Sequence, residues 1–334
     1  MRPIRKMFPG LLLSAALGVT TLAHAADTDL AATQKRAEAG DAHAQVAWGN
    51  HLFSSKDRKL RDSSTEWFRK AAMQGDHDAE WMLGSAYMAG YGVQRDGKAG
   101  LDWMRRSLAD GTPDHMAIFG ITLLTMNAIA GDQNDGVEWL NRSVTAGSAQ
   151  GMNIMGVFHL SGAFGVSKDP TEGERLMLKA AGMGNADAQA SLGALYLSDL
   201  LGAPKPAEGV RWLETAANQG NADSQGTLAY LLITGDKGVT KDPARGVTWA
   251  EKAAAKNNAR GYYALGLAYL SGNGEQRDPA QAWFNLGVAE RLDTKHQLTK
   301  VADHMSEAAT QLNAGDLERL RARIEKIPKP EGAS

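Results

Sequence analysis

The chain contains no cysteine among its 334 residues. Disulfides, thiolate nucleophiles and cysteine-based metal sites are therefore excluded together. The eight histidines are scattered, and none is followed by another histidine four positions later, so the zinc-protease helix motif is absent. Ser-x-x-Lys and Gly-x-Ser-x-Gly, two sequence signs of serine hydrolases, are absent as well. We expect no catalytic residues, no metal and no cofactor.

Long apolar segments are absent beyond the N-terminus. There, three basic residues precede a short apolar run over residues 11–22, and Ala23-His24-Ala25 forms a small-x-small site. This three-part pattern predicts a secretory signal peptide, residues 1–25, that is cleaved after Ala25. The alternative is an uncleaved anchor, which the short run disfavours because a span needs about 20 apolar residues. We expect a periplasmic protein of a Gram-negative bacterium, or else a secreted one, with no stable membrane insertion after cleavage.

An excess of basic charge is also lacking. The chain has 36 Lys and Arg against 38 Asp and Glu. The first 25 residues hold three of the basic residues and no acidic one, so the mature chain would carry 33 against 38, a net charge of −5. A mildly acidic exported protein is a poor general binder of nucleic acid or of anionic membrane. We therefore expect no nucleic-acid partner.

The chain has an internal repeat instead. A small residue within an apolar stretch returns every 35–37 residues, in seven copies, at Gly49, Gly84, Gly120, Gly156, Gly193, Ala229 and Gly266. A tryptophan follows in six copies, at Trp67, Trp103, Trp139, Trp212, Trp249 and Trp283, with Arg175 at this position in the fourth. A period kept through seven copies predicts stacked structural units that share one continuous core.

The second copy shows what one unit should be. Apolar residues from Ala79 to Tyr87 recur at i, i+4, i+7 and i+8, which is one face of a helix. The glycine-rich segment 89–93 breaks this pattern, and Asp96 is placed to cap a second helix that ends near Ala109. The repeated small residue of the first helix should let the second helix of the same hairpin approach closely. Trp103 on that second helix should fill the space between neighbouring hairpins. Because a tryptophan buries a large area, these side chains should dominate the packing energy, and the loss of one would cost about 3–5 kcal/mol. Each copy thus predicts a helix-loop-helix hairpin.

Two copies carry a family resemblance. Residues 184–196 (Gly-Asn-Ala-Asp-Ala-Gln-Ala-Ser-Leu-Gly-Ala-Leu-Tyr) and 241–254 (Lys-Asp-Pro-Ala-Arg-Gly-Val-Thr-Trp-Ala-Glu-Lys-Ala-Ala) resemble the Sel-one-like repeat, a relative of the tetratricopeptide repeats. The resemblance extends over roughly residues 40–289. It implies an all-α fold, a right-handed superhelical solenoid of about seven helix-loop-helix repeats that is used for protein–protein contact.

The ends of the array should be closed by caps, because a solenoid must not expose its terminal apolar faces. We expect an N-terminal capping helix within residues 26–39 and two C-terminal capping helices within residues 290–328. The latter are divided at residues 313–315, with Asp316 as the cap of the second. Residues 329–334 should form a loose tail.

Departures from the repeat are candidates for partner contacts, because members of such a family differ in partner where their copies differ. The first copy replaces the glycine loop by a basic loop over residues 54–61, which includes Lys56 and Arg58. These two residues are candidates for contact with an acidic partner. The alternative is an ordinary solvated loop.

Two rows of residues along the first helices could line a concave groove, the side that these helices line in tetratricopeptide-like arrays. They lie three positions before and one position after the repeated small residue. Trp81, Asn153, Tyr230 and Tyr263 are the candidate partner-binding residues, with the three aromatic side chains as anchors. The alternative is that the earlier row belongs to the core between copies.

These observations predict an exported scaffold or adaptor that binds another protein, as a helix or an extended segment, and performs no chemistry. We expect a monomer. Two alternatives stay open. One is a peptidoglycan or glycan binder that uses exposed aromatic residues such as Tyr91, Tyr262 and Tyr263. The other is a hydrolase acting on cell-wall-related substrates, for which the sequence offers no catalytic cluster.

Overall fold

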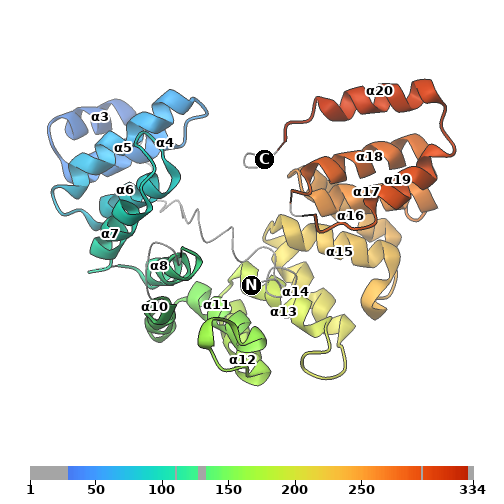
Figure 1. Ribbon diagram of the computed structural model, residues 1–334, viewed down its shortest axis with the longest axis horizontal. Helices are drawn as coiled ribbons and strands as arrows, with labels where there is room; N and C mark the ends of the chain where they lie inside the picture. The colour runs from blue at the N-terminus through green and yellow to red at the C-terminus, as the bar shows by residue number, and fades with distance from the viewer. Residues whose placement is uncertain (1–28, 110, 127–132, 295, 330–334) are drawn as a thin grey trace. The chain divides into compact units, whose positions relative to one another are not determined.

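The computed structural model describes residues 29–329 except 110, 127–132 and 295, and all the secondary structure in these residues is helical. The predicted signal peptide and all but the first residue of the predicted tail lie outside them. The chain divides into two compact units, the first ending at Lys168 and the second beginning at Asp169. In Figure 1 the helices of the first unit run from blue to green, and those of the second from yellow-green to red.

The first unit is a run of helix hairpins. Its elements are α3 (Leu30–Glu38), α4 (Ala42–Phe53), α5 (Arg58–Ala72), α6 (His77–Ala89), α7 (Gly97–Ser107), α8 (Pro113–Thr125), α10 (Gln133–Thr145), α11 (Ala149–Ser161) and the 3-10 turn η2 (Ala163–Gly165). The pairs α4/α5, α6/α7 and α8/α10 are the hairpins of copies one to three, and α3 packs against α4.

The second unit continues the same scheme. Its elements are α12 (Pro170–Gly182), α13 (Ala186–Tyr196), α14 (Pro206–Asn218), α15 (Ala222–Thr234), the 3-10 turn η3 (Asp236–Gly238), α16 (Pro243–Ala254), α17 (Ala259–Ser271), α18 (Pro279–Leu292), α19 (Val301–Ala309) and α20 (Ala314–Glu325). The hairpins of copies five to seven are α13/α14, α15/α16 and α17/α18, and both α19 and α20 pack on α18. The two helices of copy four, α11 and α12, belong to different units.

Helix ends follow the capping signals of the sequence. Asp96 caps α7 by accepting a hydrogen bond from the backbone N–H of Ala99, as predicted. Gly90 ends α6 in the left-handed conformation, with φ of 81°, which a glycine adopts without strain. One cap was wrongly assigned: α20 begins at Ala314, and its cap is Asn313, whose Oδ1 accepts from the N–H of Asp316.

The two helices of a hairpin meet at a pair of small residues. In copy two, a Cβ added to Gly84 on α6 would lie 2.8 Å from the carbonyl oxygen of Gly100 on α7. The same arrangement joins Gly120 to Gly136 and Gly193 to Gly209. The repeated small residue of the first helix therefore does allow close approach, as expected. Its small partner on the second helix was not foreseen from the sequence.

The repeated tryptophans are not the deepest residues of the core. Five of them are half-buried, whereas the residue directly after each is buried: Phe68 after Trp67, Met104 after Trp103, Leu140 after Trp139, Leu213 after Trp212 and Ala250 after Trp249. In four of the five, the Lys or Arg three positions later lies over the indole ring at 4.2–4.8 Å. Trp103 and Trp139 do pack against clusters that include the preceding copy, as expected, but the deepest position of the second helix belongs to the residue after the tryptophan.

Two assignments to the tryptophan position also need correction. A buried Gly or Ser lies three residues before each of the five half-buried tryptophans, and Gly173 and Ala282 are its counterparts in copies four and seven. Counting three residues on reaches Leu176 and Asn285, so Arg175 and Trp283 do not occupy the repeat position. Trp283 is buried instead, in a cluster with Leu270 and Leu320 of α20.

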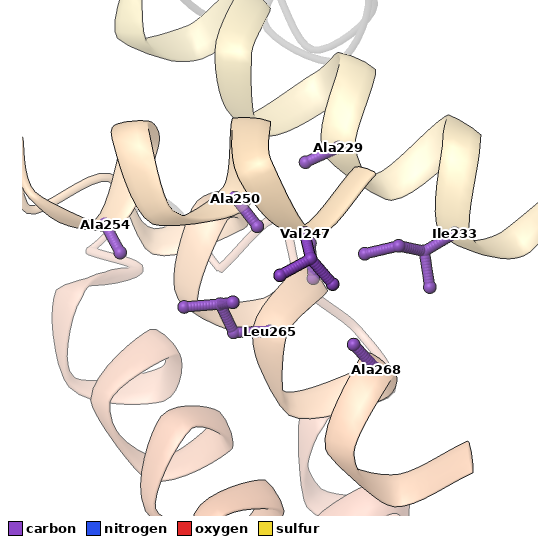
Figure 2. Packing of buried hydrophobic residues seen from close by; sticks show 8 residues of the cluster. Ala229, Ile233, Val247, Ala250, Ala254, Leu265 and Ala268 are labelled. Carbon is purple, nitrogen blue, oxygen red and sulfur yellow. The ribbon is translucent and has the colours of Figure 1, made fainter. Parts of the chain in front are cut away.

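Within the second unit, the core is built from small aliphatic residues of consecutive helices. Figure 2 shows Ala229 and Ile233 of α15, Val247 and Ala250 of α16, and Leu265 and Ala268 of α17 converging on one another. Because alanine dominates this cluster, the helix backbones lie close together, and larger side chains such as Trp249 and Tyr230 pack at its edge.

The caps of four first helices, those of copies two, four, six and seven, are matched to the copy before them. Asn258, the cap of α17, accepts the N–H of Gly261 with its Oδ1 while its Nδ2 donates to Oδ1 of Asp223 at 2.7 Å. Asn221 caps α15 and donates to Asp187 at 3.2 Å in the same way, and Ser148 caps α11 and donates to Asp114 at 2.5 Å. In copy two the roles of the two residues are exchanged. The cap is the acidic residue, Asp76, and it pairs with His43 of copy one, whose Nδ1 lies 3.2 Å from the Asp76 carboxylate.

We expect Asn258→Asp to destabilise the second unit by about 1 kcal/mol or more at neutral pH, although aspartate is as good a cap as asparagine. The substitution removes the donor and places two carboxylates against each other, so the deficit in the free energy of unfolding should shrink as the pH falls and one carboxylate takes up a proton. Asn258→Ser, which keeps a donor, is the control. Urea unfolding at about pH 7 and about pH 4 tests this, and equal losses in both variants would contradict the pairing.

Candidate interaction surfaces

The row of residues three positions before the repeated small residue lies between the first helices of adjacent copies. Trp81 of α6 is only 3% exposed, and its ring stacks on His115 of α8 with centroids 4.2 Å apart and planes 6° apart. Further along, a Cβ on Gly226 of α15 would lie 3.0 Å from the backbone nitrogen of Gly261 on α17. The alternative that assigned this row to the core therefore holds for Trp81, and the expectation that this side chain is an exposed anchor was wrong.

Burial of His115 makes the first unit sensitive to acid. The apolar surroundings lower the pKa of His115 from its usual 6.5, and the carboxylates of Asp78 and Asp114 only partly oppose this shift. The native state therefore holds the imidazole neutral, while the unfolded chain takes up the proton near pH 6.5. The free energy of unfolding should be highest above this pH and should fall as the pH falls through and below it.

We expect His115→Phe, which keeps an aromatic ring against Trp81, to lose part of this pH dependence. The measurement is the urea midpoint at about pH 7.5 and about pH 5.5, where one such histidine changes the free energy of unfolding by up to about 1.4 kcal/mol per pH unit. All other titrating groups are common to both proteins, so the difference between the two slopes isolates His115. Parallel slopes would show that His115 takes up its proton as readily in the native state as in the unfolded chain.

Two more candidates of the groove are buried. Tyr263 of α17 is 6% exposed because α19 folds back over this helix, and its hydroxyl lies 3.2 Å from Nδ1 of His304. Burial, together with the nearby Tyr230 and Asp303, raises the pKa of Tyr263 to about 12. Asn153 of α11 is 2% exposed, and its Oδ1 has no hydrogen-bond partner among the described residues. Neither is an exposed anchor, so the prediction was wrong for both residues. It failed because the sequence pattern does not tell which neighbour covers a helix face.

Tyr230 on α15 lies at the edge of the core and is less buried than the other three groove candidates. It is half-buried, stacks on Tyr263 with centroids 6.0 Å apart, and its hydroxyl lies 3.4 Å from Oδ2 of Asp236. Burial and the Asp236 carboxylate raise its pKa, so the phenol stays protonated at neutral pH. Beside it, Arg260 of α17 donates to Oγ1 of Thr227 at 2.6 Å. We call Thr227, Tyr230, Arg260 and the half-buried Leu267 the Tyr230 surface.

The basic segment of copy one is mostly helix and not loop. Helix α5 begins at Arg58 with Asp57 as its cap, so Lys56 remains in the connection while Arg58 occupies the first helical position. The Arg58 side chain is 82% exposed, and its nearest carboxylate, that of Asp62, lies 3.6 Å away. Copy one therefore presents its basic charge on an extended helix, where copies two, four, five, six and seven have a turn or bend.

Among the described residues no three His, Asp or Glu side chains gather as a metal site. No helix in the described part of the chain is long and apolar enough to cross a bilayer. Tyr91, one residue of the glycan-binding alternative, is half-buried against the ring of Phe53 and under the guanidinium of Arg61.

Comparison with known proteins agrees with the hairpin architecture. The family model described as Sel1 repeat matches residues 42–76, 77–111, 149–185, 186–221, 222–258 and 259–287. These six matches leave out copy three, which lacks the loop glycines, although α8 and α10 form its hairpin. No curated protein matches the chain.

A solved structure supports the same fold. A Sel1 repeat protein from Oxalobacter formigenes is similar over 68% of this chain and 100% of its own, with 23% identity and a TM-score of 0.56. Two others are similar at lower TM-scores. An immunity protein from Pseudomonas aeruginosa is similar over 64% of this chain and 81% of its own, with 18% identity and a TM-score of 0.48. A protective antigen of uropathogenic Escherichia coli strains with the SLR fold is similar over 91% and 98%, with 21% identity and a TM-score of 0.36.

Proposed function

Because the chain belongs to the Sel1 repeat family, whose helical repeats typically mediate protein–protein interaction, we propose that it is an exported, non-catalytic scaffold that binds a partner protein through the Tyr230 surface. Membership of this family does not by itself identify the partner, since the shared residues of the repeat are packing and capping residues. The partner must therefore be recognised by residues that differ between copies.

The proposal rests on the partial exposure of Tyr230 and on the contacts that fix its side chain. Of the four residues expected along the groove, it alone is not buried, and its ring stacks on Tyr263 while its hydroxyl lies within hydrogen-bond distance of Asp236. An aromatic side chain that is fixed before binding loses little conformational entropy on binding, which is typical of interface hot spots. Arg260 supplies a donor-rich group on the neighbouring helix.

Export is supported by the three-part pattern of the first 25 residues. We expect the protein in a periplasmic fraction to begin at Ala26. Intact mass of the protein purified from that fraction tests this expectation, and a full-length species confined to the cytoplasm would contradict it.

Binding can be tested by placing a photo-crosslinking phenylalanine derivative at position 230 in cells. We expect a discrete adduct with a protein, and we expect Arg260→Glu in the same chain to abolish it. The control is the same derivative at Leu178 of α12, which is 40% exposed and lies away from the Tyr230 surface in sequence and on another helix. Equal adducts at both positions, or no adduct at position 230, would contradict the proposal.

A further inference from the structure

Helix α5 has an exposed flank that is not part of the Tyr230 surface. With 15 residues it is the longest helix of the first unit, and the additional residues lie at its N-terminal end. Leu60 is 46% exposed there, and Trp67 follows seven residues later on the same side of the helix. We call Leu60 and Trp67, with the cations Lys56, Lys59 and Lys70 beside them, the edge strip.

The cap helix cannot cover the whole edge strip. Helix α3 has nine residues against 15 in α5, which corresponds to about 14 Å against about 22 Å. It buries Thr33 and Ala37 and packs on α4. In copy three, by contrast, Trp139 shares a cleft with Arg105, Leu108 and Ala109 of the preceding second helix. Among the residues that the structure describes, no second helix of a preceding copy lies beside the N-terminal turn of α5, and Leu60 is exposed there.

The charge of the strip is of one sign and has little internal compensation. Residues 56–61 contain four cations and one carboxylate in a chain that is acidic as a whole. Among the described residues, no carboxylate forms an ion pair with Lys56, Lys59 or Lys70, and the Lys70 ammonium instead lies 4.4 Å from the centroid of the Trp67 ring. Lys56, Lys59 and Lys70 are all exposed.

The cations at the N-terminal end of α5, those of Arg58 and Lys59, are unfavourably placed in the free protein, whereas Lys70 lies in the last turn. The first turn of α5 contains no acidic residue and begins with Arg58 and Lys59, so positive side chains face the positive end of the helix dipole. Approach of carboxylates would relieve this repulsion, while an apolar side chain could pack on Leu60 and on the edge of Trp67. The complementary ligand is therefore anionic and apolar at once.

We propose that the edge strip binds an acidic amphipathic segment of a partner protein, with apolar side chains on Leu60 and Trp67 and carboxylates at Lys56, Lys59 and Lys70. The two apolar residues lie about 10 Å apart along α5, which is two helical turns and matches apolar residues seven positions apart on a docked helix. A lipid surface fits less well, because a helix that lies in a membrane interface presents a broad apolar face and here only two apolar side chains are offered.

The test is fluorescence anisotropy with the mature protein and a labelled peptide of about 18 residues, in which Leu recurs seven positions apart and Glu occupies one flanking face. We expect saturable binding that weakens severalfold when the salt rises from about 50 mM to about 200 mM, since exposed charges are screened. The double variant K56E/K59E should bind at least about tenfold more weakly, and Leu60→Ser severalfold more weakly.

A matched control exists on another second helix. Leu178 of α12 is 40% exposed and is followed by the exposed Lys179, so L178S/K179E makes the same chemical changes elsewhere and should bind like the wild type. Circular dichroism of each variant verifies that it is folded. The proposal is overturned if the wild type does not bind the peptide, if the control loses as much affinity as K56E/K59E, or if a peptide with Lys in place of Glu binds equally well.

Vesicles rich in phosphatidylglycerol distinguish the lipid alternative. If the wild type sediments with these vesicles, K56E/K59E does not, and the acidic peptide fails to bind, the strip is a lipid site and the proposal is wrong. The crosslinking experiment at position 230 reports on a different unit of the chain, so it can succeed or fail independently of this one.

Discussion

Replacing Phe68 by alanine is expected to destabilise the first unit by about 3–5 kcal/mol, the range for a fully buried phenylalanine. Phe68 is 1% exposed, and a Cβ on Gly49 would lie 2.6 Å from its Cε1, so the ring packs directly on the backbone of α4. No larger side chain could move into the space from α4 without a shift of the helix. The cavity left by the missing ring should therefore remain open, and the full contribution of the Phe68 ring to the free energy of unfolding should be lost.

The adjacent Trp67 is the informative comparison. Although tryptophan is the larger side chain, Trp67 is half-buried and the Lys70 ammonium lies over its ring, so Trp67→Ala should cost clearly less than Phe68→Ala. Urea unfolding followed by far-UV circular dichroism measures both free energies. A larger loss for Trp67→Ala would contradict the assignment of Phe68 to the core position and would restore the tryptophan to it.

Adding one methyl group at a helix crossing should also be strongly unfavourable. In Gly84→Ala the new Cβ would meet Cγ of Met104 at 2.7 Å and the carbonyl oxygen of Gly100 at 2.8 Å. The methionine side chain could rotate, but the backbone oxygen moves only if α6 and α7 separate. We expect a loss of about 1–3 kcal/mol, as for overpacked cores, although alanine is the better helix former.

The same substitution at Gly182 should have the opposite sign. Gly182 is the last residue of α12, and a Cβ there would have no heavy atom within 4 Å. Gly182→Ala is expected to stabilise by about 0.5 kcal/mol through helix propensity. Thermal unfolding of the two variants provides the test. A loss of stability in both, or in neither, would mean that crowding at the crossing does not determine the role of Gly84.

The sequence predicted the hairpins well because their signals are local. The alternation of apolar residues from Ala79 to Tyr87 and the capping aspartate at position 96 each act within one helix, so no knowledge of neighbours is needed. The close approach at Gly84 was also foreseen, because a small residue that recurs at a fixed period within an apolar helix face indicates a helix crossing.

The surfaces could not be predicted in the same way. Whether Trp81 or Tyr263 is exposed depends on which helix lies beside it, and this is a property of the packing between copies and of the fold-back of α19. The tryptophan position misled for a related reason: a large aromatic residue invites the assignment to the core, whereas the less noticeable Phe68 or Leu213 after it is the residue that packs on the first helix. Similarly, the basic segment at Arg58 was taken for a loop because its charges conceal the helical continuation of α5.

The matching of caps to the preceding copy, seen at copies two, four, six and seven, has a consequence for how such an array can change its length. Copies five and six both begin with Asn-x-Asp, at residues 185–187 and 221–223. The Asp of one copy accepts a hydrogen bond from the Asn cap of the next copy, as Asp187 does from Asn221. Either copy could therefore be duplicated in tandem and would find a compatible neighbour on both sides. A copy that begins with an acidic cap, such as Asp76, would place two carboxylates together if it were inserted after either of them. The order of the copies is thus constrained by electrostatics, and lengthening by gene duplication should be tolerated most readily at copies five and six.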